Sequence, residues 1–117
     1  MSATVLGMST RNRAKVEPVD QYLAVFSALS EPLRVRILHI LLHDRGDDVP
    51  CTRLDDELPV GKSTVSYHVG ILRRAGMISL RKEGRNYFYQ VREDTLEKYA
   101  PNFLEYLKKV DAAQLAA

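Results

Sequence analysis

The sequence predicts a mainly α-helical fold with a small β-hairpin, an α+β class, in one domain. Apolar residues recur at helical spacing through most of the 117 residues. The exception runs from Met77 to Val91, where β-branched and aromatic residues flank a turn at Glu83-Gly84-Arg85. A helix closed by Gly76 stands directly before this hairpin, and a further helical region follows it.

The amino-terminal part divides at about residue 17. Residues 1–17 show no periodicity, so we expect a flexible arm ahead of a folded domain over residues 18–113. Val19 to Leu29 then forms a helix that is apolar nearly all round. Such a helix is expected to be buried, either inside the domain or against a second copy of the chain.

The second helix has a clear start and a clear end. Ser30-Glu31-Pro32 predicts the start, with Ser30 as the N-cap and proline in the first turn, where its missing N–H does no harm. The helix ends near Asp44, because Arg45-Gly46-Asp47-Asp48 is typical of a loop and Pro50 follows. It is the most apolar helix of the chain, through Leu33, Ile37, Leu38, Ile40, Leu41 and Leu42.

Two helices joined by a tight turn occupy the centre of the chain. We expect Thr52 to cap a short helix that reaches Leu58, and Pro59-Val60-Gly61 to form the turn. The second of the two helices spans Ser63 to Ala75, with Val65, Val69 and Leu72 inside and Ser63, Thr64, Ser66, Tyr67 and Gly70 outside. A helix-turn-helix followed at once by a hairpin is the order of a winged helix-turn-helix, which presents the helix to a DNA groove and the hairpin to the backbone.

The carboxy-terminal region is helical and interrupted. Asp94 opens it and Pro101 splits it, after which Phe103, Leu104, Leu107 and Val110 share one face. Together with the first helix, this face has more apolar surface than one small core absorbs. We therefore expect a dimer interface formed by Tyr22, Leu23, Phe26, Phe103, Leu104 and Leu107.

Positive charge is concentrated in the helix and hairpin. From Lys62 to Arg92 there are seven basic residues against Glu83 alone, a net charge of +6, whereas the whole chain carries +2. Scattered charge is usually a solvated surface, but this cluster coincides with elements suited to DNA. We expect Ser63, Thr64, Ser66 and Tyr67 to face base edges, Lys62 and Gly70 to allow close approach, and Arg73, Arg74, Arg81, Lys82 and Arg85 to contact phosphates, with Arg85 a candidate for a minor groove.

Three segments resemble one family. Ala28 to Leu38 resembles the "ALADPTRLRIL" opening of ArsR/SmtB-type winged-helix repressors, and Ser63 to Val69 resembles their "S-x-V-S-x-H-L" recognition helix. Ala75 to Ile78, with Arg85 and Tyr89, resembles their wing. The resemblance implies a repressor that forms a homodimer, in which the first and last helices pair. It also implies that the two recognition helices of the dimer read an inverted-repeat operator.

The metal sites of that family are not matched. Its arsenic, cadmium and lead sensors carry Cys-x-Cys before a leucine; if that leucine is Leu54, the two positions are Pro50 and Thr52, with Cys51 between them. Its zinc, nickel and cobalt sensors use Asp/His sets on the last helix, and residues 94–117 contain no His or Cys. We expect no cofactor and no metal at these positions.

The remaining candidate ligands have simpler interpretations. His39 and His43 lie four residues apart, and an unusual metal site there is the alternative to a solvated helix face. His68 is expected to brace the recognition helix by a hydrogen bond rather than to contact DNA. Cys51 is most simply a small apolar residue, with a reactive thiol as the alternative.

Other function classes find little support. The single cysteine suits a reducing cytosol, and no signal sequence or membrane-length apolar run is visible, so a cytoplasmic protein without membrane association is expected. No phosphate loop or nucleophile–base motif is present, so we expect no enzyme. A winged-helix protein-interaction module that does not bind DNA remains the rival hypothesis, and a small molecule, an oxidant, an unusual metal or nothing could be the inducer.

Overall fold

The computed structural model describes residues 16, 18–44 and 48–115. Most of the expected N-terminal arm, and residues 45–47 of the expected loop, lie outside these ranges. The elements are, in chain order, α2 (Val19–Leu29), α3 (Pro32–His43), β1 (Val49–Pro50), α4 (Cys51–Glu57), α5 (Lys62–Arg74), β2 (Ile78–Glu83), β3 (Asn86–Val91), α6 (Glu93–Tyr99), α7 (Pro101–Lys109) and α8 (Ala112–Leu115). The predicted α+β class, a winged helix-turn-helix, is confirmed.

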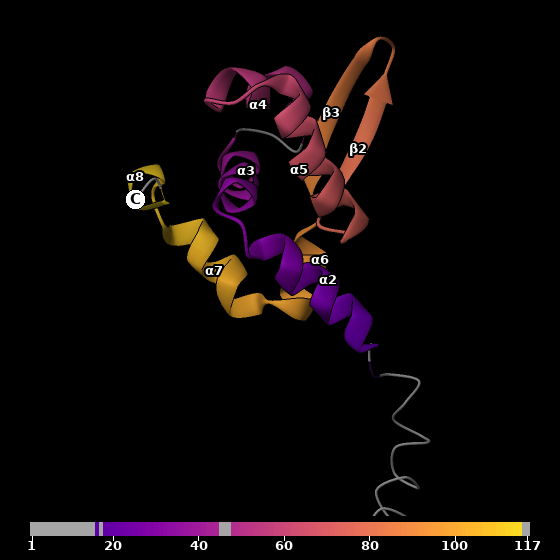
Figure 1. The fold of residues 1–117 in the computed structure, drawn as a ribbon, viewed down its shortest axis with the longest axis vertical. Helices are drawn as coiled ribbons and strands as arrows, with labels where there is room; N and C mark the ends of the chain where they lie inside the picture. The colour runs from indigo at the N-terminus through magenta and orange to yellow at the C-terminus, as the bar shows by residue number, and fades with distance from the viewer. Residues whose placement is uncertain (1–15, 17, 45–47, 116–117) are drawn as a thin grey trace, which may run out of the picture.

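The hairpin belongs to a three-stranded antiparallel sheet of order β1-β3-β2. Leu80 and Val49 both stand opposite Tyr89, so this tyrosine lies in the middle of the sheet. Gly84 turns the hairpin with φ of +63°, a conformation that side chains with a Cβ rarely adopt. The hairpin projects away from the helices alongside α5, and we call it the wing (Figure 1).

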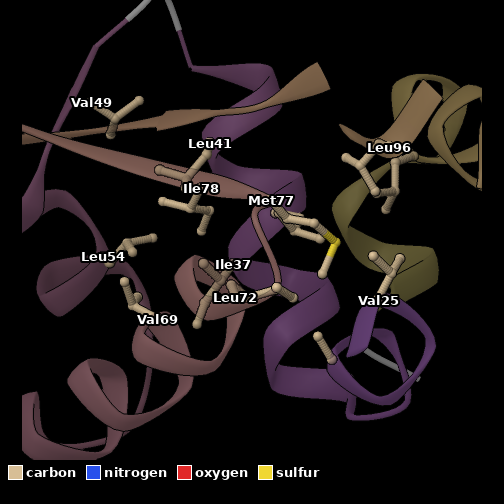
Figure 2. Close-up of a cluster of buried hydrophobic side chains, with 14 of the residues drawn as sticks. Val25, Ile37, Leu41, Val49, Leu54, Val69, Leu72, Met77, Ile78 and Leu96 are labelled. Carbon is tan, nitrogen blue, oxygen red and sulfur yellow. The ribbon is translucent and has the colours of Figure 1, made fainter. Parts of the chain in front are cut away.

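The core forms around α3, which contacts α2, α5, α7 and β3. Figure 2 shows Ile37 and Leu41 of α3 among side chains from the neighbouring elements, with Met77 pointing toward Val25 and Leu96. Ile37, Met77 and Leu96 are fully buried. Each such side chain stabilises the fold by about 1.5–3 kcal/mol relative to an exposed position. The packed core therefore holds α5 and the base of the wing in place.

Two predicted helix caps were wrong. Glu31, rather than Ser30, is the N-cap of α3, and its carboxylate accepts a hydrogen bond from the backbone N–H of Leu33. Ser30 instead ends α2 and donates its hydroxyl to the carbonyl of Ser27 at 2.7 Å. The short helix α4 begins at Cys51 after Pro50, so Thr52 lies inside its first turn and does not cap it.

The apolar faces of the first and last helices differ from the prediction. Leu104 and Leu107, expected in a dimer interface, are 4% and 0% exposed within one protomer because α7 packs against α3. Conversely, α2 is not buried all round: Leu23 and Phe26 are 55% and 50% exposed. Leu104 and Leu107 therefore belong to the protomer core, and the surplus apolar surface of these two helices is mainly on α2, with Tyr106 exposed on α7.

The break between α6 and α7 falls where proline was expected to place it. Pro101 is the first residue of α7, directly after Ala100. Within the described ranges, none of the helices has the length and apolar character needed to cross a bilayer.

Candidate nucleic-acid interface

The helix α5 has one buried face and one exposed face, as its sequence pattern predicts. Val65, Val69 and Leu72 are 3%, 2% and 0% exposed and anchor the helix in the core. The opposite face carries the polar residues singled out for base contacts, and Tyr67 is 62% exposed at its centre. The exposed residues of this face are Lys62, Ser63, Thr64, Ser66 and Tyr67.

Gly70 lies on the same helix but is covered by an arginine. A Cβ built at Gly70 would lie 3.3 Å from Nη1 of Arg74, so the guanidinium crosses the helix at this point. Arg73 and Arg74 also line a hollow of about 460 Å³ between the end of α5 and β2. The glycine therefore makes room for Arg74, and both arginines lie at the junction between the helix and the wing.

On the wing, the basic residues are not equivalent. Arg81 donates to the carboxylate of Asp48 at 2.7 Å and also to that of Glu83. The hydrogen bond with Asp48, followed by that with Glu83, raises the pKa of the Arg81 guanidinium. Two acidic partners already offset the charge of Arg81, so this residue is less suited to a phosphate than the prediction assumed.

Lys82 and Arg85 stand further along the wing. Nζ of Lys82 lies 5.7 Å from the ring centroid of Tyr87, which faces it across the hairpin. Arg85 is exposed beside Gly84 at the tip. Glu83, the nearest acidic residue in the sequence, pairs with Arg81. Arg85 thus keeps a charge that could be presented to DNA.

A second hollow, of about 330 Å³, separates α4, α5 and the wing. Cys51 and Tyr89 face it, and the tyrosine hydroxyl forms a hydrogen bond with the cysteine sulfur. Burial raises the pKa of the Cys51 thiol, and burial together with this hydrogen bond raises the pKa of Tyr89. Both groups therefore keep their protons at neutral pH, which does not favour a reactive thiolate.

His68 is anchored from behind, as expected. It is 9% exposed, and its Nδ1 lies 3.0 Å from Nη1 of Arg34, itself a buried residue of α3. Nε2 of His68 lies 3.7 Å from a carboxylate oxygen of Glu31. The prediction of a hydrogen bond that braces α5 is confirmed, and the partner, Arg34, is a residue that sequence reasoning missed.

The expected solvated face was wrong for His39, which is 8% exposed, whereas His43 is exposed as predicted. Nε2 of His39 bonds the carbonyl of Val110 at 2.7 Å, and Nε2 of His43 bonds that of Leu107 at 2.9 Å. The centroids of the two rings lie 4.1 Å apart, with their planes tilted by 36°. In the part of the chain that the structure describes, no group of three His, Cys, Asp or Glu residues is placed to hold a metal ion. The sequence did contain a signal for these bonds: the end of α7 lacks a capping glycine, so its last carbonyls need hydrogen-bond donors from elsewhere.

Comparison with known proteins agrees with this geometry. A family model described as a helix-turn-helix domain matches residues 29–81. The HTH-type transcriptional regulator YceK of Bacillus subtilis (strain 168) is 38% identical over 89 residues, which cover 75% of this chain and 88% of that protein. The transcriptional repressor SdpR of the same strain is 29% identical over 87 residues, which cover 74% of this chain and 93% of SdpR.

Solved structures show the same architecture. An ArsR-like transcriptional regulator from Rhodococcus sp. RHA1 superimposes with a TM-score of 0.62 at 28% identity, covering 75% of this chain and 80% of that one. The homodimeric winged helix-turn-helix DNA-binding domain of a possible ArsR-family regulator from Mycobacterium bovis gives a TM-score of 0.64 at 22% identity. The match covers 81% of this chain and 84% of that one, and it shows a similarity of fold. The helix-turn-helix has a polar outer face, a basic wing lies beside it, and the relatives share this architecture. The chain therefore belongs to the ArsR/SmtB-type family of winged helix-turn-helix, DNA-binding transcriptional regulators.

Proposed function

We propose that this protein is a homodimeric repressor that occludes a promoter by binding an inverted-repeat operator, and that it has no enzymatic activity. The observation that carries the proposal is the polar, exposed face of α5 beside a basic wing. A relative named as a repressor supports the direction of regulation. A structural neighbour described as homodimeric supports the assembly.

In this proposal the two elements contact different parts of the duplex. The helix α5 enters the major groove, where Ser63, Thr64, Ser66 and Tyr67 reach base edges. Arg85 at the wing tip contacts the backbone, as do Lys82 and the two arginines at the end of α5. Arg81 contributes less, because Asp48 and Glu83 already bind its guanidinium.

The proposed dimer interface centres on α2. Val19, Leu23 and Phe26 are 64%, 55% and 50% exposed, and their spacing places them along one side of the helix. On α7, Tyr106 is 48% exposed and its ring stacks on that of Phe103, with centroids 5.9 Å apart. These side chains, rather than Leu104 and Leu107, are the ones that a second copy could cover.

Regulation by a metal at the family's usual positions is not part of the proposal. Pro50 and Thr52 supply no thiolate, and the imidazoles of His39 and His43 are engaged with backbone carbonyls. The inducer, if there is one, is then a different kind of molecule.

The test is selection of binding sites from a pool of random duplexes, followed by gel shifts at two salt concentrations. The proposal predicts enrichment of an inverted repeat and a shift by one dimer, with an affinity that falls as salt rises. Enrichment of no sequence, or binding that is insensitive to salt, would contradict the proposal and favour a protein-interaction module.

A further inference from the structure

The buried guanidinium of Arg34 joins three helices. Its Nε donates to the carbonyl of Ala28 at 2.8 Å, and its Nη2 donates to that of Ser27 at 3.3 Å, both in the last turn of α2. Its Nη1 reaches Nδ1 of His68 on α5 at 3.0 Å. Arg34 itself belongs to α3 and is 8% exposed. One side chain therefore connects the end of α2 to the middle of α5.

The partners fix the tautomer of the histidine. A guanidinium can only donate hydrogen bonds, so Nδ1 of His68 must accept, and the proton of the neutral ring is on Nε2. That nitrogen points toward the carboxylate of Glu31, 3.7 Å away. The chain from Glu31 through His68 to Arg34 thus places an anion and a cation on the two sides of one neutral ring.

His68, the middle member of this series of contacts, also touches the surface proposed to read DNA. The ring of Tyr67 meets that of His68 edge to face, with centroids 5.1 Å apart and planes at 75°. Tyr67 is 62% exposed, whereas His68 is 9% exposed. A shift of Arg34 would therefore reach the exposed face of α5 through His68, although neither Arg34 nor His68 lies on that face.

We propose that Arg34 and His68 are positioning residues for operator discrimination: their hydrogen bond sets the orientation of α5 relative to α2, and so the distance between the two α5 helices in the dimer. This inference rests on the proposed function, because it requires a dimer that pairs through α2. A dimer reads half-sites at a fixed separation. Loosening the Arg34–His68 contact should relax the tolerated separation while leaving charge-driven binding to any DNA unchanged.

The variants separate the hydrogen bond from the side chains that form it. His68→Asn keeps an acceptor close to the position of Nδ1, whereas His68→Leu removes it at similar size. Arg34→Lys keeps the charge but cannot donate to three partners that lie in different directions. Arg36→Lys, two residues along the same helix, is the matched control for Arg34→Lys.

The measurement uses the duplex that the wild-type protein selects, and duplexes in which the half-site separation is changed by one or two base pairs. Affinities are measured at a temperature where thermal unfolding shows every variant to be folded. His68→Leu and Arg34→Lys should lower the preference for the selected separation by about tenfold, with unchanged affinity for scrambled DNA. His68→Asn and Arg36→Lys should keep the preference. Equal preference in all four variants would overturn the inference, as would equal loss in His68→Asn and His68→Leu.

A second measurement does not depend on DNA. Long-range proton–nitrogen correlation spectra of the wild-type protein at about pH 8, where an ordinary imidazole is neutral, should show His68 protonated at Nε2 and bare at Nδ1. The opposite tautomer would show that Arg34 does not bind this ring and would overturn the inference. A wild-type protein that selects no DNA sequence would overturn the proposed function and the discriminating role of Arg34 together, and the tautomer would still report whether the contact exists.

Discussion

His39 and Val110 are joined by a hydrogen bond of 2.7 Å between the imidazole Nε2 and the backbone carbonyl, although 71 positions separate them in the chain. His43, one turn further along α3, makes the same kind of bond to Leu107. The two histidines therefore satisfy carbonyls at the end of α7, where the helix stops at Lys109 and does not supply the next N–H groups. This contact holds the carboxy-terminal helix against the centre of the core.

His39→Leu should lower the free energy of unfolding by about 1–3 kcal/mol, because it leaves the carbonyl of Val110 without its donor. His39→Gln is the matched control, since its amide nitrogen can take the place of Nε2. Urea unfolding of both variants checks the prediction. A His39→Leu protein as stable as the wild type would mean that this bond contributes nothing.

The two leucines Leu23 and Leu107 should respond differently to a charge. Leu23→Asp places a carboxylate on the exposed face of α2 and should yield a folded monomer. Leu107→Asp buries a carboxylate where the wild-type side chain is 0% exposed, and should prevent folding. Sedimentation and circular dichroism distinguish the outcomes. A Leu23→Asp protein that remains a dimer of wild-type strength would place the interface elsewhere.

Much of the architecture could be predicted because it depends on local patterns. The first helix is observed over Val19–Leu29 as predicted. Gly76 and Gly84, predicted to end a helix and to turn the hairpin, both have positive φ, whereas Gly61 of the predicted interhelical turn has a φ of −72° that other residues also adopt. The strand β1 was missed because two residues are too few for any periodicity. Its existence depends on Tyr89 and Phe88, which pair with Val49 and Pro50 although they lie 40 and 38 positions later in the chain.

The errors concern contacts that only the tertiary structure creates. An apolar stripe on a helix predicts burial but does not say whether the neighbour is the same chain or a copy, which is why Leu107 was assigned to the dimer. His39 was predicted on a solvated face and Arg34 was given no role, because polar side chains are usually exposed. Each is buried because backbone carbonyls from another helix meet it.

Arg85 and Arg81 form a matched pair on the wing. Arg85→Ala should weaken binding to every DNA sequence and reduce the slope of log affinity against log salt by about 0.9. Arg81→Ala should change the slope less, because Asp48 and Glu83 already neutralise that guanidinium. Gel shifts over a salt series measure both slopes. Equal slopes for wild type and Arg85→Ala would show that the wing tip does not touch DNA.

The Cys51–Tyr89 pair should make the free energy of unfolding fall as the pH rises through the alkaline range. The folded state raises the pKa of both acids, so between the unfolded and folded pKa values it binds more protons than the unfolded chain. The stabilisation by these groups is therefore complete below about pH 8.5, the ordinary range of a thiol, and is lost as pH rises above it. Urea unfolding should show a steeper alkaline loss for the wild type than for a Cys51→Ala/Tyr89→Phe double variant. Parallel curves would show that neither group is shifted in the folded protein.

The central claim is that the exposed face of α5 reads DNA sequence, and Tyr67 at 62% exposure is its most prominent side chain. The most direct test compares the affinities of wild type and Tyr67→Ala for the selected operator and for a scrambled duplex of the same length. The account predicts that Tyr67→Ala lowers the difference between the two binding free energies by about 1–3 kcal/mol, with little change on scrambled DNA. Equal weakening on both duplexes would contradict the account, because it would make Tyr67 a backbone contact and put another face of α5 in the groove.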